Sequence, residues 1–266
     1  MKHEILRNLS TECPWRDTLY WYDTIDSTNV RIKQLAKEGA PQGTVVIAGE
    51  QTGGRGRLGR SFSSPAGQGV YLSALLRPAC PPEKLMHLTC AVAVAMCRAV
   101  ERACGVRPGI KWTNDLVHGN KKLGGILTEV AVDSRTGLLE YAIVGVGINC
   151  LQSTQDFPRE LRDMAASLSM VSGKRVSPGI LAAAMTEELY ALSGSLLTQK
   201  EILMASYKES CITLGKDVVL IRGEEVRYGR ALDLDDSGAL LVDFGNGDIR
   251  PVSSGEVSVR GMYGYL

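Results

Sequence analysis

The sequence predicts an α+β fold, in which a mixed β-sheet with flanking helices is followed by a small all-β unit. In the first 212 residues, short apolar runs typical of strands are interspersed with longer segments of helical periodicity. From residue 213 the chain changes to short strand-like segments separated by turns rich in Gly, Asn and Asp. We therefore expect two domains, residues 1–212 and 213–266, and we expect the second to close into a small barrel.

The elements follow from local apolar patterns and capping signals. The first helix is expected to start at a strand-to-helix corner, where Asp26 or Ser27 can cap it, and to stop at Gly39. Further helices are expected at residues 83–104, 159–165, 178–197 and 200–209. Strands of the first domain are expected at residues 18–22, 44–48, 70–76, 110–117, 123–132 and 139–148, with 110–117 and 123–132 as a hairpin. Strands of the second domain are expected at residues 217–221, 225–233, 239–244, 249–252 and 257–260.

Composition places the chain among globular proteins and argues against several kinds of partner. Thirty basic and 29 acidic side chains leave a net charge of +1, so no overall field attracts nucleic acid or an anionic membrane. The chain has no charge-free window of membrane-spanning length and no signal-peptide core, which favours a cytoplasmic location. The seven cysteines lack a C-x-x-C pair and the three histidines lack zinc-site spacing, so we expect packed thiols and no structural metal.

The most informative segment is residues 51–60, which contains four glycines and three arginines directly after an apolar strand. Glycine lets backbone N–H groups approach a ligand closely, and arginine presents a fork of donors to carboxylate or phosphate oxygens. The segment contains G-x-G-x-x-G, but no helix can start in the following residues 62–69, so it is not a dinucleotide-binding turn. It predicts an anion-binding loop, with a solvated surface loop as the plain alternative.

Three further polar clusters stand where strands begin or end. Asp26-Ser27-Thr28-Asn29 lies at the first strand-to-helix corner, although a helix cap alone would explain one of these residues. Lys111-Trp112-Thr113-Asn114-Asp115 either ends a strand at the mouth of a pocket or forms a simple turn. In Lys122-Leu123-Gly124-Gly125, a lysine opens an apolar strand and two glycines leave the backbone open to a ligand, although a solvated hairpin lysine beside a bulge would have the same pattern.

Together these clusters resemble the biotin protein ligase family in order and approximate spacing. The shared motifs are D-S-T-N, Q-x-x-G-R-G-R-x-G-R, K-W-x-N-D, K-x-x-G-I-L and G-x-G-I-N, the last at residues 145–149. The resemblance covers residues 20–150 with specific motifs and continues more weakly to Arg260. It implies a class II synthetase-like catalytic domain, an SH3-like barrel, and a two-step reaction that forms biotinyl-5′-AMP from biotin and ATP and then biotinylates a lysine of a biotin carboxyl carrier domain.

The resemblance also implies roles for single residues. Lys122 would contact the biotin carboxylate and the α-phosphate with the help of Arg57, and these are the implied catalytic residues. The implied biotin-binding residues are Ser27, Thr28, Asn29, Gln51, Gly54, Arg55, Arg57, Lys122, Gly124 and Gly125. The implied ATP-binding residues are Arg55, Arg57, Arg60, Phe62, Asn114, Asp115, Lys122, Asn149, Glu256 and Arg260. Mg²⁺ would accompany ATP, bound mainly through phosphate oxygens.

Departures from the family pattern are modest. Leu58 stands where some members carry another arginine, Thr113 where many have proline, and Gly124 where others have alanine. About 25 residues precede Asp26, too few for a winged helix-turn-helix, so a monofunctional ligase without DNA binding is expected. A homodimer is left open.

Three other functions remain as alternatives. A lipoate or octanoate ligase would share the fold, but it would not be expected to combine this loop with D-S-T-N. A sensor would bind biotin or nucleotide without turnover, and Lys122 and the arginines argue against it. A nucleic-acid-binding barrel is disfavoured by the acidic segments 224–225 and 233–236.

Overall fold

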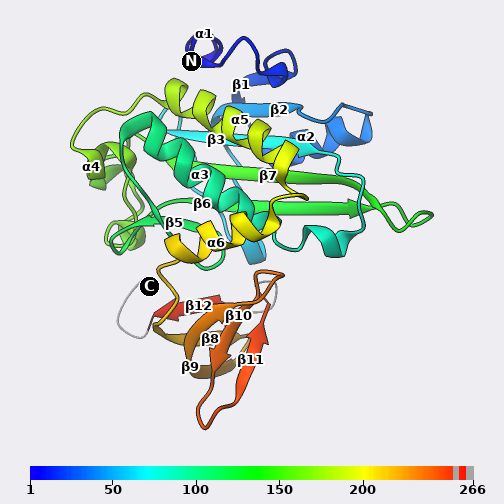
Figure 1. Ribbon diagram of the computed structural model, residues 1–266. Helices are drawn as coiled ribbons and strands as arrows, with labels where there is room; N and C mark the ends of the chain where they lie inside the picture. Colours follow the sequence, from blue (N-terminus) through cyan, green and yellow to red (C-terminus); the bar gives the residue numbers. More distant parts are fainter. Residues whose placement is uncertain (254–257, 262–266) are drawn as a thin grey trace.

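The computed structural model describes residues 1–253 and 258–261, which form two sheets with flanking helices (Figure 1). The first sheet has seven strands in the order β1-β2-β3-β7-β6-β5-β4, all antiparallel except the β1–β2 pair. Its strands are β1 (Leu19–Ile25), β2 (Val45–Gln51), β3 (Gly69–Leu76), β4 (Gly109–Lys111), β5 (Asp115–His118), β6 (Lys121–Val132) and β7 (Leu139–Asn149). The helices are α1 (Lys2–Asn8), α2 (Thr28–Lys37), α3 (Leu88–Cys104), α4 (Leu168–Ser172), α5 (Pro178–Ser195) and α6 (Lys200–Ser210).

The strand alternation of this sheet divides its side chains between two apolar layers. Even-numbered residues of β7, such as Val144 and Val146, join the main core under α3 and α5, whereas Tyr141 and Ile143 join a smaller core with Ile32 of α2. Figure 1 shows α3, α5 and α6 together over the sheet. The sheet is therefore covered by several helices on one face and by α2 on the other.

The second sheet has five antiparallel strands in the order β11-β10-β9-β8-β12. They are β8 (Asp217–Arg222), β9 (Glu225–Leu234), β10 (Leu240–Asp243), β11 (Ile249–Val252) and β12 (Ser258–Gly261). The pairings found among the described residues do not join β11 to β12, the contact that would close the expected barrel. Buried side chains of this sheet, such as Val218 and Leu240, nevertheless belong to the main core. Trp112 also joins the two parts, because it donates its indole N–H to the carbonyl oxygen of Gly238, 3.0 Å away.

Most predicted elements are confirmed, but three predicted spans are wrong. The helix expected from residue 83 begins at Leu88, and a short 3-10 turn over Pro82–Leu85 precedes it. The strand expected at 110–117 is two short strands, β4 and β5, which pair with each other across residues 112–114. The helix expected at 159–165 is limited to a 3-10 turn at Arg159–Leu161, because residues 162–164 form a turn and residues 164–166 then bond to the backbone of Lys122. Tertiary contacts override helical periodicity there.

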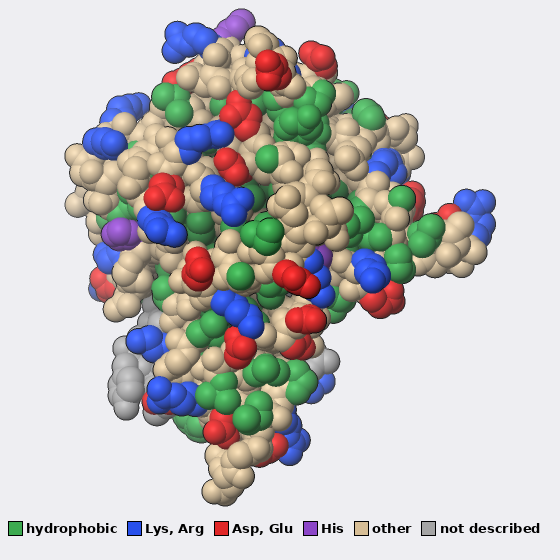
Figure 2. Space-filling view, in the orientation of Figure 1, with side chains coloured by type: hydrophobic (Ala, Val, Ile, Leu, Met, Phe, Trp, Pro, Cys, Tyr) green, Lys and Arg blue, Asp and Glu red, His purple; other side chains and the backbone are tan. Residues whose placement is uncertain are grey.

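The surface carries mixed charge. Figure 2 shows basic and acidic side chains interspersed over the face seen in this orientation, as the near-zero net charge leads one to expect. Within the described parts of the chain, no helix combines the length and apolar character needed to cross a membrane. The same residues contain no group of three or more His, Cys, Asp or Glu side chains arranged to hold a metal ion.

Candidate functional site

On the α2 face, part of the sheet is lined by small residues. Ser73 of β3 and the three glycines Gly125, Gly145 and Gly147 occupy strand positions on the face where Tyr141 and Ile143 pack under α2. Gly125 and Gly147 are cross-strand partners, so neither contributes a side chain at that point. Beyond the start of α2 the sheet therefore presents mostly backbone, on which a flat ligand could lie.

An ion pair stands over this stretch of sheet. Lys122 Nζ lies 2.6 Å from Asp115 Oδ1, and both groups lie directly above Gly125, since a Cβ there would stand 3.4 and 3.5 Å from them. The Lys122 side chain is about one-third exposed. The cation is thus held beside the glycine floor, the name used here for the strand positions of Gly125, Gly145 and Gly147, and it remains accessible to an anionic ligand.

Arg57 approaches the same place from the glycine- and arginine-rich loop. Its Nη1 donates to Asn114 Oδ1 at 2.9 Å, and Asn114 is fixed in turn by bonds to the backbone of Ile126. Arg57 Nη2 is buried and has no hydrogen-bond partner among the described residues. Burial lowers the pKa of the guanidinium from its usual value, opposed by the charge of Asp115. A partly buried guanidinium with a buried, unused donor suits an anion.

The loop itself folds as a short hairpin. Isolated antiparallel bridges join Gln51 to Ser64 and Arg55 to Ser61, and residues 57–59 make a 3-10 turn at the tip. Gly54 is required here, because a Cβ would collide with the carbonyl oxygen of Phe62. Two of the sequence-predicted arginines, Arg55 and Arg60, are exposed.

Phe62 lies against the glycine floor. A Cβ at Gly147 would stand 2.5 Å from Phe62 Cε1, and the ring also makes an edge contact with Tyr71 at 6.4 Å between centroids. The aromatic predicted for the nucleotide is therefore on the same face as Lys122.

The D-S-T-N corner is linked to the loop by a hydrogen-bond network. The backbone N–H and the hydroxyl of Thr28 both donate to Gln51 Oε1, at 2.9 and 3.1 Å, and Gln51 Nε2 donates to Ser64 Oγ at 2.9 Å. Ser27 occupies the N-cap position of α2 and is only 2% exposed, but its side chain makes no capping bond. The cap alternative therefore does not account for the Ser27 hydroxyl, although its backbone position is that of an N-cap.

Asn29 and Ser73 connect this corner to the sheet through hydrogen bonds. The Ser73 hydroxyl donates to Asn29 Oδ1 at 2.6 Å and lies 2.8 Å from Thr28 Oγ1. Asn29 Nδ2 donates to Glu129 Oε2 at 2.9 Å. Ser73 and Glu129 were not predicted from the sequence, although a single serine in the otherwise apolar run of residues 70–76 was a usable signal.

The remaining predicted residues are less closely associated. Gly124 allows the backbone of β7 to approach closely, since a Cβ at this position would collide with the carbonyl oxygen of Gly147. Asn149 is 6% exposed, and its amide is bonded to Ala166 and Gln152. Arg260 lies in β12 opposite Val219. Glu256 falls outside the described residues.

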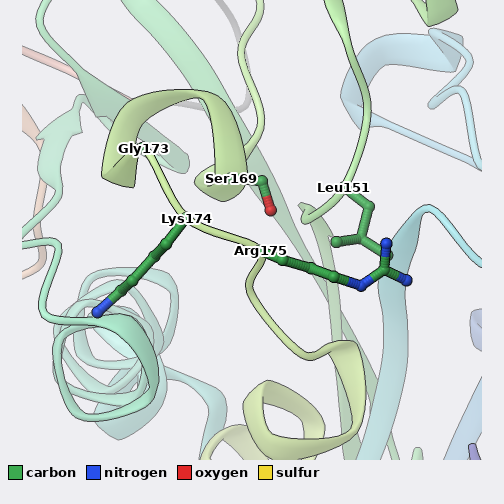
Figure 3. Close-up of a pocket in the computed structure, with 5 residues that line it drawn as sticks. All are labelled: Leu151, Ser169, Gly173, Lys174 and Arg175. Carbon is green, nitrogen blue, oxygen red and sulfur yellow. The ribbon is translucent and has the colours of Figure 1, made fainter.

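One surface pocket is lined by none of these groups. It has a volume of about 370 Å³ and is lined by Leu151, Ser169, Gly173, Lys174 and Arg175, none of them a predicted site residue. Figure 3 shows the Lys174 and Arg175 side chains pointing in different directions. These two cations therefore do not point toward one common ligand position.

Comparison with known proteins agrees with this arrangement. Residues 21–149 match the Biotin/lipoate A/B protein ligase family, and residues 213–260 match the Biotin protein ligase C terminal domain. The bifunctional ligase/repressor BirA of Bacillus subtilis is 35% identical over 262 residues, which cover 96% of this chain and 78% of the relative. The biotin–(acetyl-CoA-carboxylase) ligase of Mycobacterium tuberculosis is 32% identical over 237 residues, 87% of this chain and 85% of the relative.

Among solved structures, the biotin protein ligase of Aquifex aeolicus in complex with biotin and ATP superposes with a TM-score of 0.76 at 28% identity. The match covers 92% of this chain and 99% of that chain. The fold, the ordered motifs and the extent of these similarities lead to one conclusion. This chain belongs to the biotin protein ligase family.

Proposed function

We propose that this protein is an ATP-dependent biotin protein ligase. In the first step the biotin carboxylate attacks the α-phosphate of ATP, giving biotinyl-5′-AMP and pyrophosphate. In the second step a lysine ε-amine of a biotin carboxyl carrier domain attacks the acyl carbon, forming an amide and releasing AMP. The observation that carries the proposal is that Lys122 stands over Gly125 in an ion pair with Asp115, while Arg57 bonds to the adjacent Asn114 and keeps one buried donor unused.

The first step brings two anions together, so it needs positive charge fixed where negative charge accumulates. Lys122 would contact both the carboxylate and the α-phosphate, and the negative charge of Asp115 is available to balance the lysine before substrates bind. The unused Nη2 donor of Arg57 would bond to one of the same oxygens. Neither residue needs to exchange a proton, because the protein's contribution is to position and stabilise charge.

The ureido ring of biotin presents one carbonyl oxygen and two N–H groups, all of which need partners once buried. The Ser27 hydroxyl, which is not used as a helix cap, and the Thr28–Gln51 pair are the polar groups at the corner of α2. Asn29 is already bonded at both ends of its amide, so we assign it to holding Thr28 and Ser73 in place.

For the nucleotide, we assign Phe62 to the adenine ring, and Asn114, Arg55 and Arg60 to the neighbourhood of the phosphates. Asn149, whose amide is bonded to Ala166 and Gln152, has no assigned contact with the nucleotide. Glu256 and Arg260 stay predictions that rest on the family resemblance. The described residues hold no cluster of carboxylates for a metal, so Mg²⁺ would bind through the phosphates of ATP and water. When bound there, it would neutralise charge on the departing pyrophosphate.

The acceptor we propose is a carrier domain of acetyl-CoA carboxylase or of another biotin-dependent carboxylase, because relatives carry names of that kind. The division into a catalytic domain, residues 1–212, and a C-terminal unit, residues 213–266, also stays a proposal. A cytoplasmic location and the absence of DNA binding remain predictions, and the oligomeric state is left open.

Pyrophosphate exchange into ATP tests the proposal without a carrier protein. Biotin, lipoate and octanoate would be supplied separately, and exchange should depend on biotin alone. Exchange with lipoate or octanoate would assign the protein to the alternative ligase, a distinction that matters because the matched family includes both. Biotin binding without exchange of any acid would favour the sensor.

A further inference from the structure

The backbone of Lys122 is held by a segment that no sequence motif indicated. Lys122 N donates to the carbonyl oxygen of Met164 at 2.7 Å, and Ala166 N donates to the carbonyl oxygen of Lys122 at 2.9 Å. These bonds form a parallel bridge between Lys122 and Ala165. Strand β7 pairs with β6 only as far as Gly124, so at Lys122 the neighbour of β6 on that side is the segment of residues 164–166.

The side chain of Asn149 ties this segment to the end of β7. Asn149 Nδ2 donates to the carbonyl oxygen of Ala166 at 3.2 Å, and Gln152 Nε2 donates to Asn149 Oδ1 at 3.2 Å. Ser167 Oγ closes the circuit by donating to the carbonyl oxygen of Gln152 at 2.6 Å. All three side chains are buried, so the circuit is shielded from competing water.

Gln152 has an unusual feature within this circuit. It is 2% exposed, yet its Oε1 has no hydrogen-bond partner among the described residues. A buried side-chain carbonyl oxygen without a partner opposes folding, so this oxygen does not explain why a glutamine stands here. What the glutamine supplies is the Nε2 donor that fixes the amide of Asn149.

We propose that Gln152 and Asn149 are positioning residues for Lys122. They act through the backbone of Ala166, which they hold against the lysine, and so they set where the ammonium group stands relative to the two reacting anions. The inference rests on the proposed function. It gives Asn149 a different role from direct contact with phosphate or metal, since both ends of its amide are occupied by the protein.

A double-mutant cycle on ligand affinity tests the proposal. The probe is a non-hydrolysable biotinyl-adenylate analogue with a sulfamide in place of the phosphate, and its dissociation constant is measured by calorimetry. Gln152→Met should weaken binding about tenfold in the parent protein and less than about twofold in the Lys122→Ala background, because the two residues contribute as one unit. Gln155→Met, three residues along and exposed, should change neither value.

Equal weakening by Gln152→Met in both backgrounds would overturn the proposal, because it would mean that Gln152 acts independently of Lys122. Asn149→Ala provides a second cycle that does not depend on the folding of the first variant. An Asn149 that contacted the ligand directly would give additive losses, whereas the positioning role predicts non-additive ones. Failure of the parent protein to bind the analogue at all would instead count against the proposed function.

Discussion

Asn29 Oδ1 lies where the first side-chain atom of residue 145 would stand if that residue were not glycine. Gly145 is on β7 and Asn29 is in the first turn of α2, so the contact sets how closely the helix approaches the sheet. The same Asn29 oxygen accepts the Ser73 hydroxyl, which is also next to Thr28. The position of the proposed biotin-binding corner therefore depends on the absence of a side chain at Gly145 of β7.

Gly145→Ala should displace Asn29 and with it Thr28. We expect biotin affinity to fall about tenfold and the free energy of unfolding to fall by about 1–3 kcal/mol, as for other overpacked sites. Calorimetric titration with biotin and urea unfolding measure the two effects. Gly194→Ala on α5, where a Cβ meets no atom of the described residues within 4 Å, is the control; it should leave biotin affinity unchanged and raise the free energy of unfolding by no more than about 1 kcal/mol. Unchanged biotin affinity in Gly145→Ala would contradict the assignment of this corner.

Ser73→Ala removes the hydroxyl that joins Asn29 to Thr28. The variant should lose about 1–2 kcal/mol of stability, because the Asn29 oxygen is left buried without its donor, and its KM for biotin should rise several-fold with little change in the KM for ATP. Steady-state exchange kinetics separate the two constants. Ser193→Ala serves as the control, because this serine on α5 donates its hydroxyl to the carbonyl oxygen of Tyr190 in the same helix. Equal increases in both constants would indicate a general loss of structure instead.

Trp112→Phe tests the link between the K-W-T-N-D segment and the second sheet. The substitution keeps an aromatic ring but removes the donor to Gly238, so the melting temperature should fall by several degrees, for a loss of about 1–3 kcal/mol. Trp21→Phe removes a similar bond to Asp23 at the surface and should have a much smaller effect. Equal melting temperatures for the two variants would mean that the contact with Gly238 contributes little.

Much of the site could be predicted from the sequence, because its motifs are local. The loop, Lys122 and the corner at Ser27 each belong to a short run of distinctive residues, and the fold brings them together. The residues that hold these motifs in place could not be predicted, because they are of common types and stand outside the motifs. Their role follows only from the contacts that they make in the folded chain. Ser73 touches Asn29 across 44 positions, and Gln152 reaches Lys122 only through two other residues.

The fold shows the same division. Strands with clear alternation or continuous apolar character were placed correctly, and so was the change to short strands near residue 213. The strand expected at 110–117 failed because Trp112 turns out of the sheet, where its backbone N–H bonds to Thr213 Oγ1 at 2.9 Å and its indole bonds to Gly238. Apolar periodicity cannot reveal such a turn, since Trp112 is buried either way.

Alkaline pH should destabilise the protein through its buried thiols. Burial raises the pKa of Cys90, Cys97 and Cys150 from 9.0 to about 12. Above pH 9 the unfolded chain loses these protons while the folded chain keeps them, so stability is fully present below pH 9 and is lost as pH rises towards 12. Each thiol should remove about 1.4 kcal/mol per pH unit in that window.

Urea unfolding under reducing conditions at about pH 8 and pH 10 measures this loss. Cys90, Cys97 and Cys150 should contribute about equally to the pH dependence of the unfolding free energy, so Cys97→Ala should remove about one-third of their joint contribution. The substitution should also lower stability at all pH values, because it removes buried atoms. Identical unfolding free energies at the two pH values would show that the thiols titrate normally in the folded state.

The most direct test of the central claim is biotin-dependent exchange of pyrophosphate into ATP in the parent protein, Lys122→Ala and Lys121→Ala. The account predicts exchange in the parent and an exchange rate reduced by about a hundredfold or more in Lys122→Ala. It predicts a nearly normal rate in Lys121→Ala, which removes the neighbouring lysine at the start of β6. Exchange at the parent rate in Lys122→Ala would remove the lysine from the chemistry. No exchange in the parent protein would contradict the assignment of biotin adenylation itself.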